Sequence, residues 1–165
     1  MAPQPRLSPY NPQSPYLFRA EAVRVAAAIA TARAVEHIGS TAVPGLAGKP
    51  TIDLAVGVPT LELDAAAFSR MEALGYAYGG DHGRPQHVFR KGERVPWEYL
   101  VHVVEHDGAM WRDYLRFRDH LRTHAEDARA YAALKASLLA GRDSWYSGRD
   151  KEAFIAPILA RVDAA

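Results

Sequence analysis

The sequence predicts an α+β fold in which a small mixed β-sheet is followed by packed helices. Short apolar runs with strand-like alternation occur between residues 34 and 105, and the clearest are Thr51–Val58 and Trp97–Glu105. From Gly108 onward the apolar residues recur instead with helical spacing. Strands interspersed with helices and followed by a run of helices are typical of a helix layer packed on a sheet.

The first elements each have a local signal. Residues 1–15 form a proline-rich lead that we expect to be irregular. Tyr16–Thr31 is rich in alanine and places apolar residues near one face, which predicts a helix. Ala34–Ile38 is a short and mostly apolar run that ends at Gly39, so we expect a strand that leads into a turn.

The later elements follow the same logic. Leu61–Leu74 lies between Pro59-Thr60 and Gly75, which are start and stop signals for a helix. The glycine-rich stretch 75–94 contains short strand candidates, of which Gln86–Arg90 is the best. The remaining predicted helices are Ala109–His120, Glu126–Ala140 and Lys151–Val162.

Composition indicates one domain over residues 1–165. With 165 residues, 48% of them hydrophobic, and with no internal repeat or linker, the chain can bury a core of its own. The absence of cysteine excludes disulfides and thiolate ligands and is consistent with a reducing compartment. No apolar run reaches the roughly 20 residues that span a bilayer, and the lead lacks the apolar core of a signal peptide. We therefore expect a cytoplasmic protein without a membrane partner.

Net charge gives no general attraction to nucleic acid. The formal charge is +1, and the arginines of the C-terminal half are interleaved with acidic residues. Nucleic acid is therefore not indicated as a partner.

The turn after Ile38 is suited to phosphate. Glycine at position 39 allows close backbone approach, and Ser40 and Thr41 add hydroxyl donors beside free backbone amides. An ordinary turn is the alternative for such a short motif.

Asp53 is the only charge in Thr51–Val58. Strand alternation places Asp53 and Ala55 on one face and Leu54 and Val56 on the other. An aspartate within a strand is disfavoured, so we expect it to meet a cation, a hydrogen-bond network or an exposed strand face.

Three motifs resemble the GrpB (UPF0157-type) family. They are HIGSTAVPGLAGKPTID at His37–Asp53, the helical stretch Trp111–Leu139 with FRDHLR and AYAALK, and YNP at Tyr10–Pro12. The resemblance covers nearly the whole chain. It implies the nucleotidyltransferase fold and transfer of a nucleoside monophosphate from an NTP, with Mg²⁺ as cofactor.

The resemblance also implies site residues. The superfamily uses two carboxylates separated by one residue, but here Asp53 is followed by Ala55 in the second position. A third acid on a later strand corresponds best to Glu98, so Asp53 and Glu98 are the expected catalytic and metal-binding pair. His102 shares the strand face of Glu98 and is expected as a ligand, a base or a hydrogen-bond partner. A surface position for Glu98 and a packed position for His102 are the alternatives.

Other polar residues keep two interpretations. Lys49 lies just before the Asp53 strand and either reaches a phosphate or is exposed. Arg118 and Arg122 share a helix face and either bind an acidic group or form a structural ion pair, and Tyr131 with Lys135 repeats this spacing. His37 is expected to hold the turn by a hydrogen bond.

Two functions remain open from the sequence. The first is a nucleotidyltransferase with Gly39, Ser40 and Thr41 at the triphosphate and an unidentified acceptor as second substrate. The second is a nucleotide- or phosphate-binding module of the same fold, which the missing carboxylate at Ala55 favours.

Overall fold

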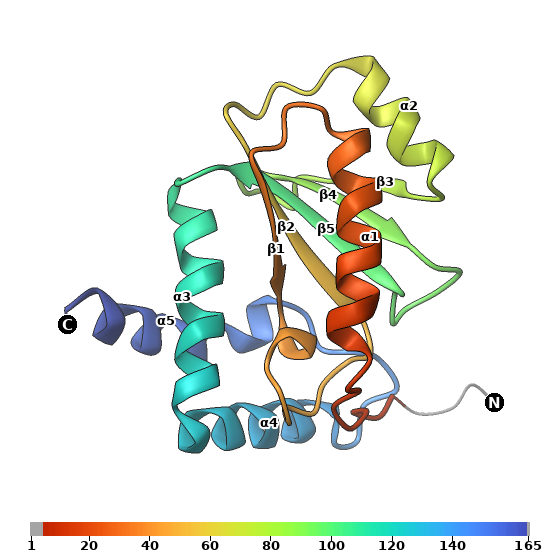
Figure 1. The fold of residues 1–165 in the computed structure, drawn as a ribbon. Helices are drawn as coiled ribbons and strands as arrows, with labels where there is room; N and C mark the ends of the chain where they lie inside the picture. Colours follow the sequence, from red (N-terminus) through yellow and green to blue (C-terminus); the bar gives the residue numbers. More distant parts are fainter. Residues whose placement is uncertain (1–4, 165) are drawn as a thin grey trace.

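The computed structural model describes residues 5–164 and has a five-stranded mixed sheet at its centre, in the order β1-β2-β5-β4-β3 (Figure 1). β2 and β5 run parallel, and the other neighbouring pairs are antiparallel. The strands are β1 Ala34–Ile38, β2 Ile52–Val58, β3 Ala77–Gly80, β4 His87–Lys91 and β5 Tyr99–Glu105. The predicted α+β class is confirmed.

Helices cover both faces of this sheet. The helices are α1 Ser14–Ala28, α2 Ala65–Ala73, α3 Ala109–Thr123, α4 Ala125–Leu139 and α5 Arg149–Asp163. α1 and α2 pack on one face, where Val25 and Met71 join the main core. α3 packs on the other face, where Trp111 contacts a second core cluster. In Figure 1 α4 passes below the sheet and α5 lies beside α3.

The alternation predicted for β2 is confirmed. Leu54 and Val56 are fully buried in the main core with the α1 side chains, whereas Ala55 lies in the cluster with Trp111 on the α3 side. Asp53 shares the Ala55 face by the same alternation. The Asp53 side chain therefore lies on the face of the sheet that the C-terminal helix α3 covers.

Some predicted boundaries were wrong for local reasons. The helix predicted from Leu61 begins at Ala65, because the Asp64 side chain caps it by accepting a hydrogen bond from Ala67 N. The helix predicted from Tyr16 begins at Ser14, where Pro15 fits the first turn. The expected irregular lead has no helix or strand over residues 5–13 except a bridge from Ser8 to Gly48, and residues 1–4 lie outside the described part.

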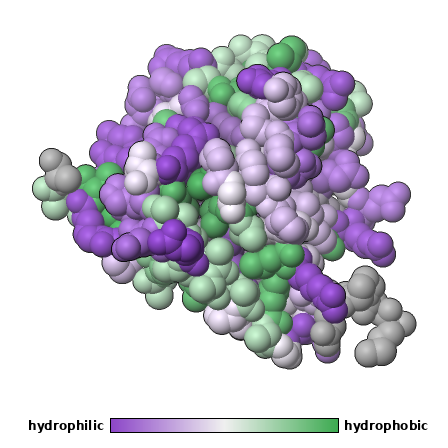
Figure 2. All heavy atoms as spheres, turned by 60° about the horizontal axis from the view of Figure 1, so that its bottom comes forward, coloured by the Kyte–Doolittle hydropathy of each residue, from purple (hydrophilic) through white to green (hydrophobic). Residues whose placement is uncertain are grey.

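The lower side of Figure 1 carries apolar surface. Figure 2 turns this side forward and shows green and pale green side chains gathered below a broad hydrophilic area. α4 runs along this side and exposes Ala130, Ala133 and Ala136. Within residues 5–164, no helix combines the length and the apolar character needed to cross a membrane.

Candidate functional site

The site is built around a single helical turn, η1 Ser40–Ala42, which follows β1 directly. Gly39 enters this turn with φ 75°, a conformation that favours glycine. A Cβ at Gly39 would lie 2.5 Å from Oδ2 of Asp53, so the carboxylate rests against the glycine backbone. Two separate reasons therefore favour glycine at position 39: the positive φ of the turn and the close approach of Asp53.

Lys135 of α4 reaches this turn from the far half of the chain. Its side chain is fully buried, and its Nζ donates hydrogen bonds to Ser40 Oγ and to Ala47 O, both at 2.6 Å. Burial, together with the charge of Lys151, lowers the pKa of Lys135 to about 7. Gly48 permits the approach, since a Cβ there would lie 2.6 Å from Ser40 Cβ and 3.0 Å from Lys135 Nζ.

The charges of two more lysines, Lys49 and Lys151, act on Lys135. Lys49 Nζ donates to Tyr146 O at 2.9 Å and lies 4.4 Å from the centre of the Tyr146 ring. Burial, reinforced by the Lys151 charge, lowers the pKa of Lys49 to about 8. Burial also lowers the pKa of Lys151, whose Nζ lies 5.5 Å from the Tyr146 ring centre.

The charge of Asp53 acts on all three of these lysines without a direct ion pair among residues 5–164. This charge raises the pKa of Lys49, Lys135 and Lys151, against the larger effect of burial. The three ammonium groups thus lie close enough for their charges to interact, and Asp150 adds a second carboxylate that acts on Lys49. We call Ser40, Lys49, Lys135 and Lys151 the lysine turn; its excess of positive charge and its hydroxyl donor suit an anion.

Asp53 is also paired with His102. The His102 Nε2 lies 3.6 Å from Asp53 Oδ1, and its Nδ1 lies 3.3 Å from Gln86 Oε1. The parallel register of β2 and β5 sets Ala55 beside His102, which brings the imidazole to the Asp53 side of the sheet. His102 is thus a close neighbour of the carboxylate, while its hydrogen-bonding contacts are with Gln86 and Tyr114.

Glu98 occupies a different environment. It is exposed and lies just before β5, where its backbone N–H bonds to Lys91 O and its carbonyl accepts from Ile52 N. Across residues 5–164, no hydrogen bond or ion pair joins Glu98 to Asp53, and no cluster of three or more His, Asp or Glu side chains could hold a metal.

The remaining polar residues hold the turn from its other side. The His37 Nε2 lies 2.9 Å from Thr41 Oγ1, as expected, and Thr41 Oγ1 donates to Thr51 O at 3.2 Å. Arg118 forms an ion pair with Glu36 at 2.6 Å, so its structural interpretation is the one observed, and Arg122 Nε donates to Ala42 O at 2.8 Å.

Sequence reasoning gave no role to Lys151 and left Lys135 undecided. The available signal for Lys135 was its spacing four residues after Tyr131 on one helix face. That spacing does not indicate contact with a turn 95 residues earlier. Lys49 is not the exposed loop lysine that was one of its two alternatives, because its side chain is partly buried against Tyr146, and its contact with a phosphate stays a prediction.

Comparison with known proteins identifies the family. The family model described as "GrpB protein" matches residues 4–161. The chain belongs to the GrpB family. The crystal structure of a conserved GrpB protein from Enterococcus faecalis is similar, with a TM-score of 0.84, 31% identity, and coverage of 95% of this chain and 96% of that one.

Curated members of the GrpB family agree with this assignment. A UPF0157 protein of Deinococcus radiodurans is 39% identical over 148 residues, which are 84% of this chain and 72% of the relative. A UPF0157 protein of Pseudomonas aeruginosa is 36% identical over 166 residues, covering 95% of this chain and 67% of the relative. These matches place the chain in a family without giving it a reaction.

Proposed function

We propose that this GrpB-family chain binds the phosphate groups of a nucleotide at the lysine turn. The observation that carries the proposal is the buried Lys135 ammonium bonded to Ser40 Oγ, with Lys49 and Lys151 close enough to lower its pKa further. Concentrating three like charges is unfavourable for the protein alone, and a bound polyanion would relieve this repulsion.

Asp53 and His102 give a second candidate function, nucleotidyl transfer. Mg²⁺ in nucleotide sites is often held by one or two carboxylates plus the substrate phosphates, so Asp53 alone fits one such ion but not a two-metal centre. When bound, the ion would neutralise charge on the phosphates. His102 would accept the proton of an acceptor hydroxyl as its oxygen bonds to the α-phosphorus and pyrophosphate leaves.

Binding is the better supported of the two. The expected second carboxylate, Glu98, is exposed just before β5, and Ala55 occupies the position where a second acid was expected after Asp53. Phosphate binding at the lysine turn requires no second carboxylate. Nucleotidyl transfer would also need an acceptor substrate for Asp53 and His102 to act on, and the site does not specify its identity.

Thermal-shift titration tests the proposal. The four NTPs are titrated with and without Mg²⁺ on the native chain, Lys135→Met and Asp53→Ala. An NTP at 100 times its dissociation constant should stabilise the native chain by about 2.7 kcal/mol, which is several degrees for a domain of this size. We expect Lys135→Met to lose most of this shift.

The Asp53→Ala variant separates the two functions. If stabilisation survives in Asp53→Ala and does not need Mg²⁺, the chain binds phosphate without a metal. If stabilisation needs both Asp53 and Mg²⁺, transfer becomes the leading function and a search for the acceptor is justified. No shift with any NTP would contradict the proposal.

A further inference from the structure

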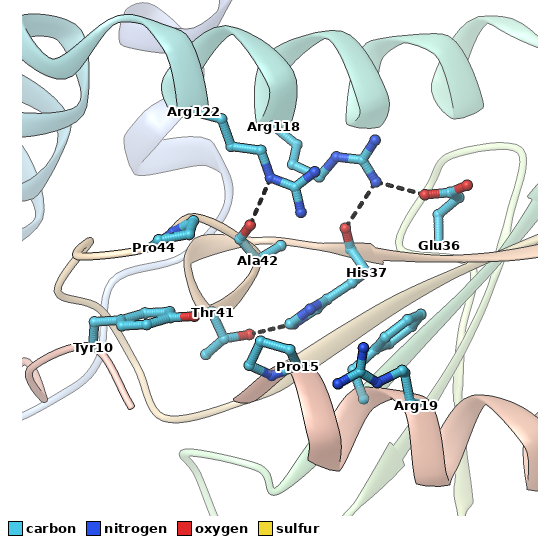
Figure 3. Close-up of a pocket in the computed structure, with 11 residues that line it drawn as sticks. Tyr10, Pro15, Arg19, Glu36, His37, Thr41, Ala42, Pro44, Arg118 and Arg122 are labelled. Atoms are coloured by element: carbon cyan, nitrogen blue, oxygen red, sulfur yellow. Dashed lines mark hydrogen bonds and ion pairs between the residues drawn. The ribbon is translucent and has the colours of Figure 1, made fainter. Parts of the chain in front are cut away.

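A pocket separate from the lysine turn lies at the outer side of the edge strand β1, between α1 and α3 (Figure 3). Its volume is about 510 Å³, within the range of small-molecule sites. It meets the lysine turn only at η1, where Thr41 and Ala42 line it while Ser40 faces Lys135. None of the three lysines lines it, so an inference drawn here does not rest on the proposed function.

The pocket carries an excess of positive charge. Arg19, Arg118 and Arg122 line it together with one carboxylate, that of Glu36. His37 also lines it, but burial lowers its pKa to about 4, so the imidazole is neutral near pH 7. Figure 3 shows Arg118 and Arg122 coming from α3 and Arg19 coming from α1, on opposite sides of the β1 backbone.

Arg19 and Arg122 have N–H donors that are not used in hydrogen bonds within residues 5–164, whereas Arg118 is engaged by several partners. Arg118 is nine-tenths buried and already bonds to Glu36, His37 O and Asp119. Arg122 uses only Nε on Ala42 O, with Nη1 at 3.6 Å from an Asp119 oxygen. Within residues 5–164, Arg19 has neither a hydrogen bond nor an ion pair, and its guanidinium lies over Tyr16.

An aromatic wall completes the pocket. Phe18 stacks on His37 with ring centres 4.7 Å apart and planes inclined by 5°, and Tyr10 lies on the same lining. In Figure 3 Tyr10 and Pro44 flank one end of the pocket, while Arg19 lies at the other. A ligand here meets guanidinium donors and flat apolar surface together.

We propose that this pocket binds a small aromatic anion. Arg19 and Arg122 supply the positive charge and the free donors that attract its carboxylate or phosphate, and the rings of Tyr10 and Phe18 contact its aromatic part. Guanidinium forks bind both anions in two-pronged geometry, so the acidic group is the shared chemistry and the two forms are separated by experiment.

Isothermal titration calorimetry tests the site with three probes: phenyl phosphate, benzoate and the neutral benzyl alcohol. The full chain should bind at least one of the anions at least about tenfold more tightly than benzyl alcohol. Arg19→Gln and Arg122→Gln should each weaken that anion about tenfold or more. Arg112→Gln is the matched control, because Arg112 is exposed on α3 and does not line the pocket.

Arg19→Gln is the most informative variant, because the Arg19 side chain makes no hydrogen bond within residues 5–164 whose loss could disturb the fold. Unchanged affinity in both pocket variants would overturn the proposal, as would absence of binding by both anions. Loss of anion binding in Lys135→Met without loss in Arg19→Gln would place the probe in the lysine turn. That result would support the proposed function and overturn this pocket.

Discussion

Lys135 is a buried ammonium whose hydrogen-bond acceptors are a hydroxyl and a carbonyl. Neutral acceptors offset only part of the free energy of dehydrating a charge, which is why the pKa falls to about 7. The charged form of Lys135 is therefore less stable in the fold than in water. A bound phosphate would supply the missing negative partner and raise that pKa.

The stability of the chain should therefore depend on pH through Lys135. Between the folded pKa of about 7 and the ordinary value of 10.5, the unfolded chain binds more protons, so the free energy of unfolding should rise as pH rises. Lys135→Met lacks this dependence. Its stability relative to the native chain should be highest near about pH 7 and decline toward about pH 10 in urea unfolding.

Lys49 and Lys151 shift in the same direction, so only the difference between native chain and variant reports on Lys135. A difference that stays constant across this pH range would show that Lys135 is not dehydrated as the structure indicates.

His37 should make the free energy of unfolding depend on pH on the acidic side of pH 7. Its pKa of about 4 in the fold lies below the ordinary value of 6.5, because the ring is buried between Phe18 and Thr41. As pH falls from 6.5 to 4 the unfolded chain gains protons first, and the native chain should lose about 3 kcal/mol. In His37→Gln this loss should be absent, and an equal loss in that variant would contradict the assignment.

The turn between β1 and β2 is the element on which the site depends. Its two glycines at positive φ, Gly39 at 75° and Gly45 at 81°, have different surroundings. A Cβ at Gly45 meets nothing within 4 Å, whereas one at Gly39 meets Asp53 at 2.5 Å. The pair therefore separates backbone strain from steric contact.

Gly39→Ala should destabilise the fold more than Gly45→Ala. Each variant incurs backbone strain of roughly 1 kcal/mol or more, and Gly39→Ala adds roughly 1–3 kcal/mol from overpacking against Asp53. Urea unfolding of both variants measures the difference. The double variant Gly39→Ala with Asp53→Ala should recover the overpacking part, and no recovery would mean that the contact is not the cause.

The helices and strands, and the face of a strand on which a residue lies, could be predicted from the sequence. Which strands and side chains pair with one another could not. Alternation in the two long strands correctly placed Asp53 opposite Leu54 and His102 opposite Val101. The parallel register that sets Asp53 beside Leu100 depends on how the strands dock, which no local pattern specifies. The Lys135 contact with Ser40 was beyond prediction for the same reason.

The sheet and the C-terminal helices are in contact at several separate places. Trp111 of α3 packs on the sheet, Tyr131 of α4 packs against Val43 and Leu46 after the turn, and Lys49 bonds to Tyr146 O. The core is therefore shared between both halves. Unfolding of one half exposes the buried side of the other.

We expect a single cooperative unfolding transition for the full chain. Differential scanning calorimetry should give equal calorimetric and van't Hoff enthalpies, as a two-state domain does. An excess calorimetric enthalpy, or two resolved peaks, would show that the sheet and the C-terminal helices unfold separately. The prediction of one domain would then be wrong.

The order of synthesis gives the distance between Ser40 and Lys135 a further meaning. All five strands are complete by Glu105, but the buried lysine follows 30 residues later and Lys151 later still. A growing polypeptide that has emerged only as far as β5 possesses Ser40, Lys49 and Asp53 but lacks Lys135 and Lys151. The phosphate binding proposed for the lysine turn would therefore be complete only when translation is nearly finished, and fragments released early by the ribosome would compete poorly with the complete protein for such a ligand.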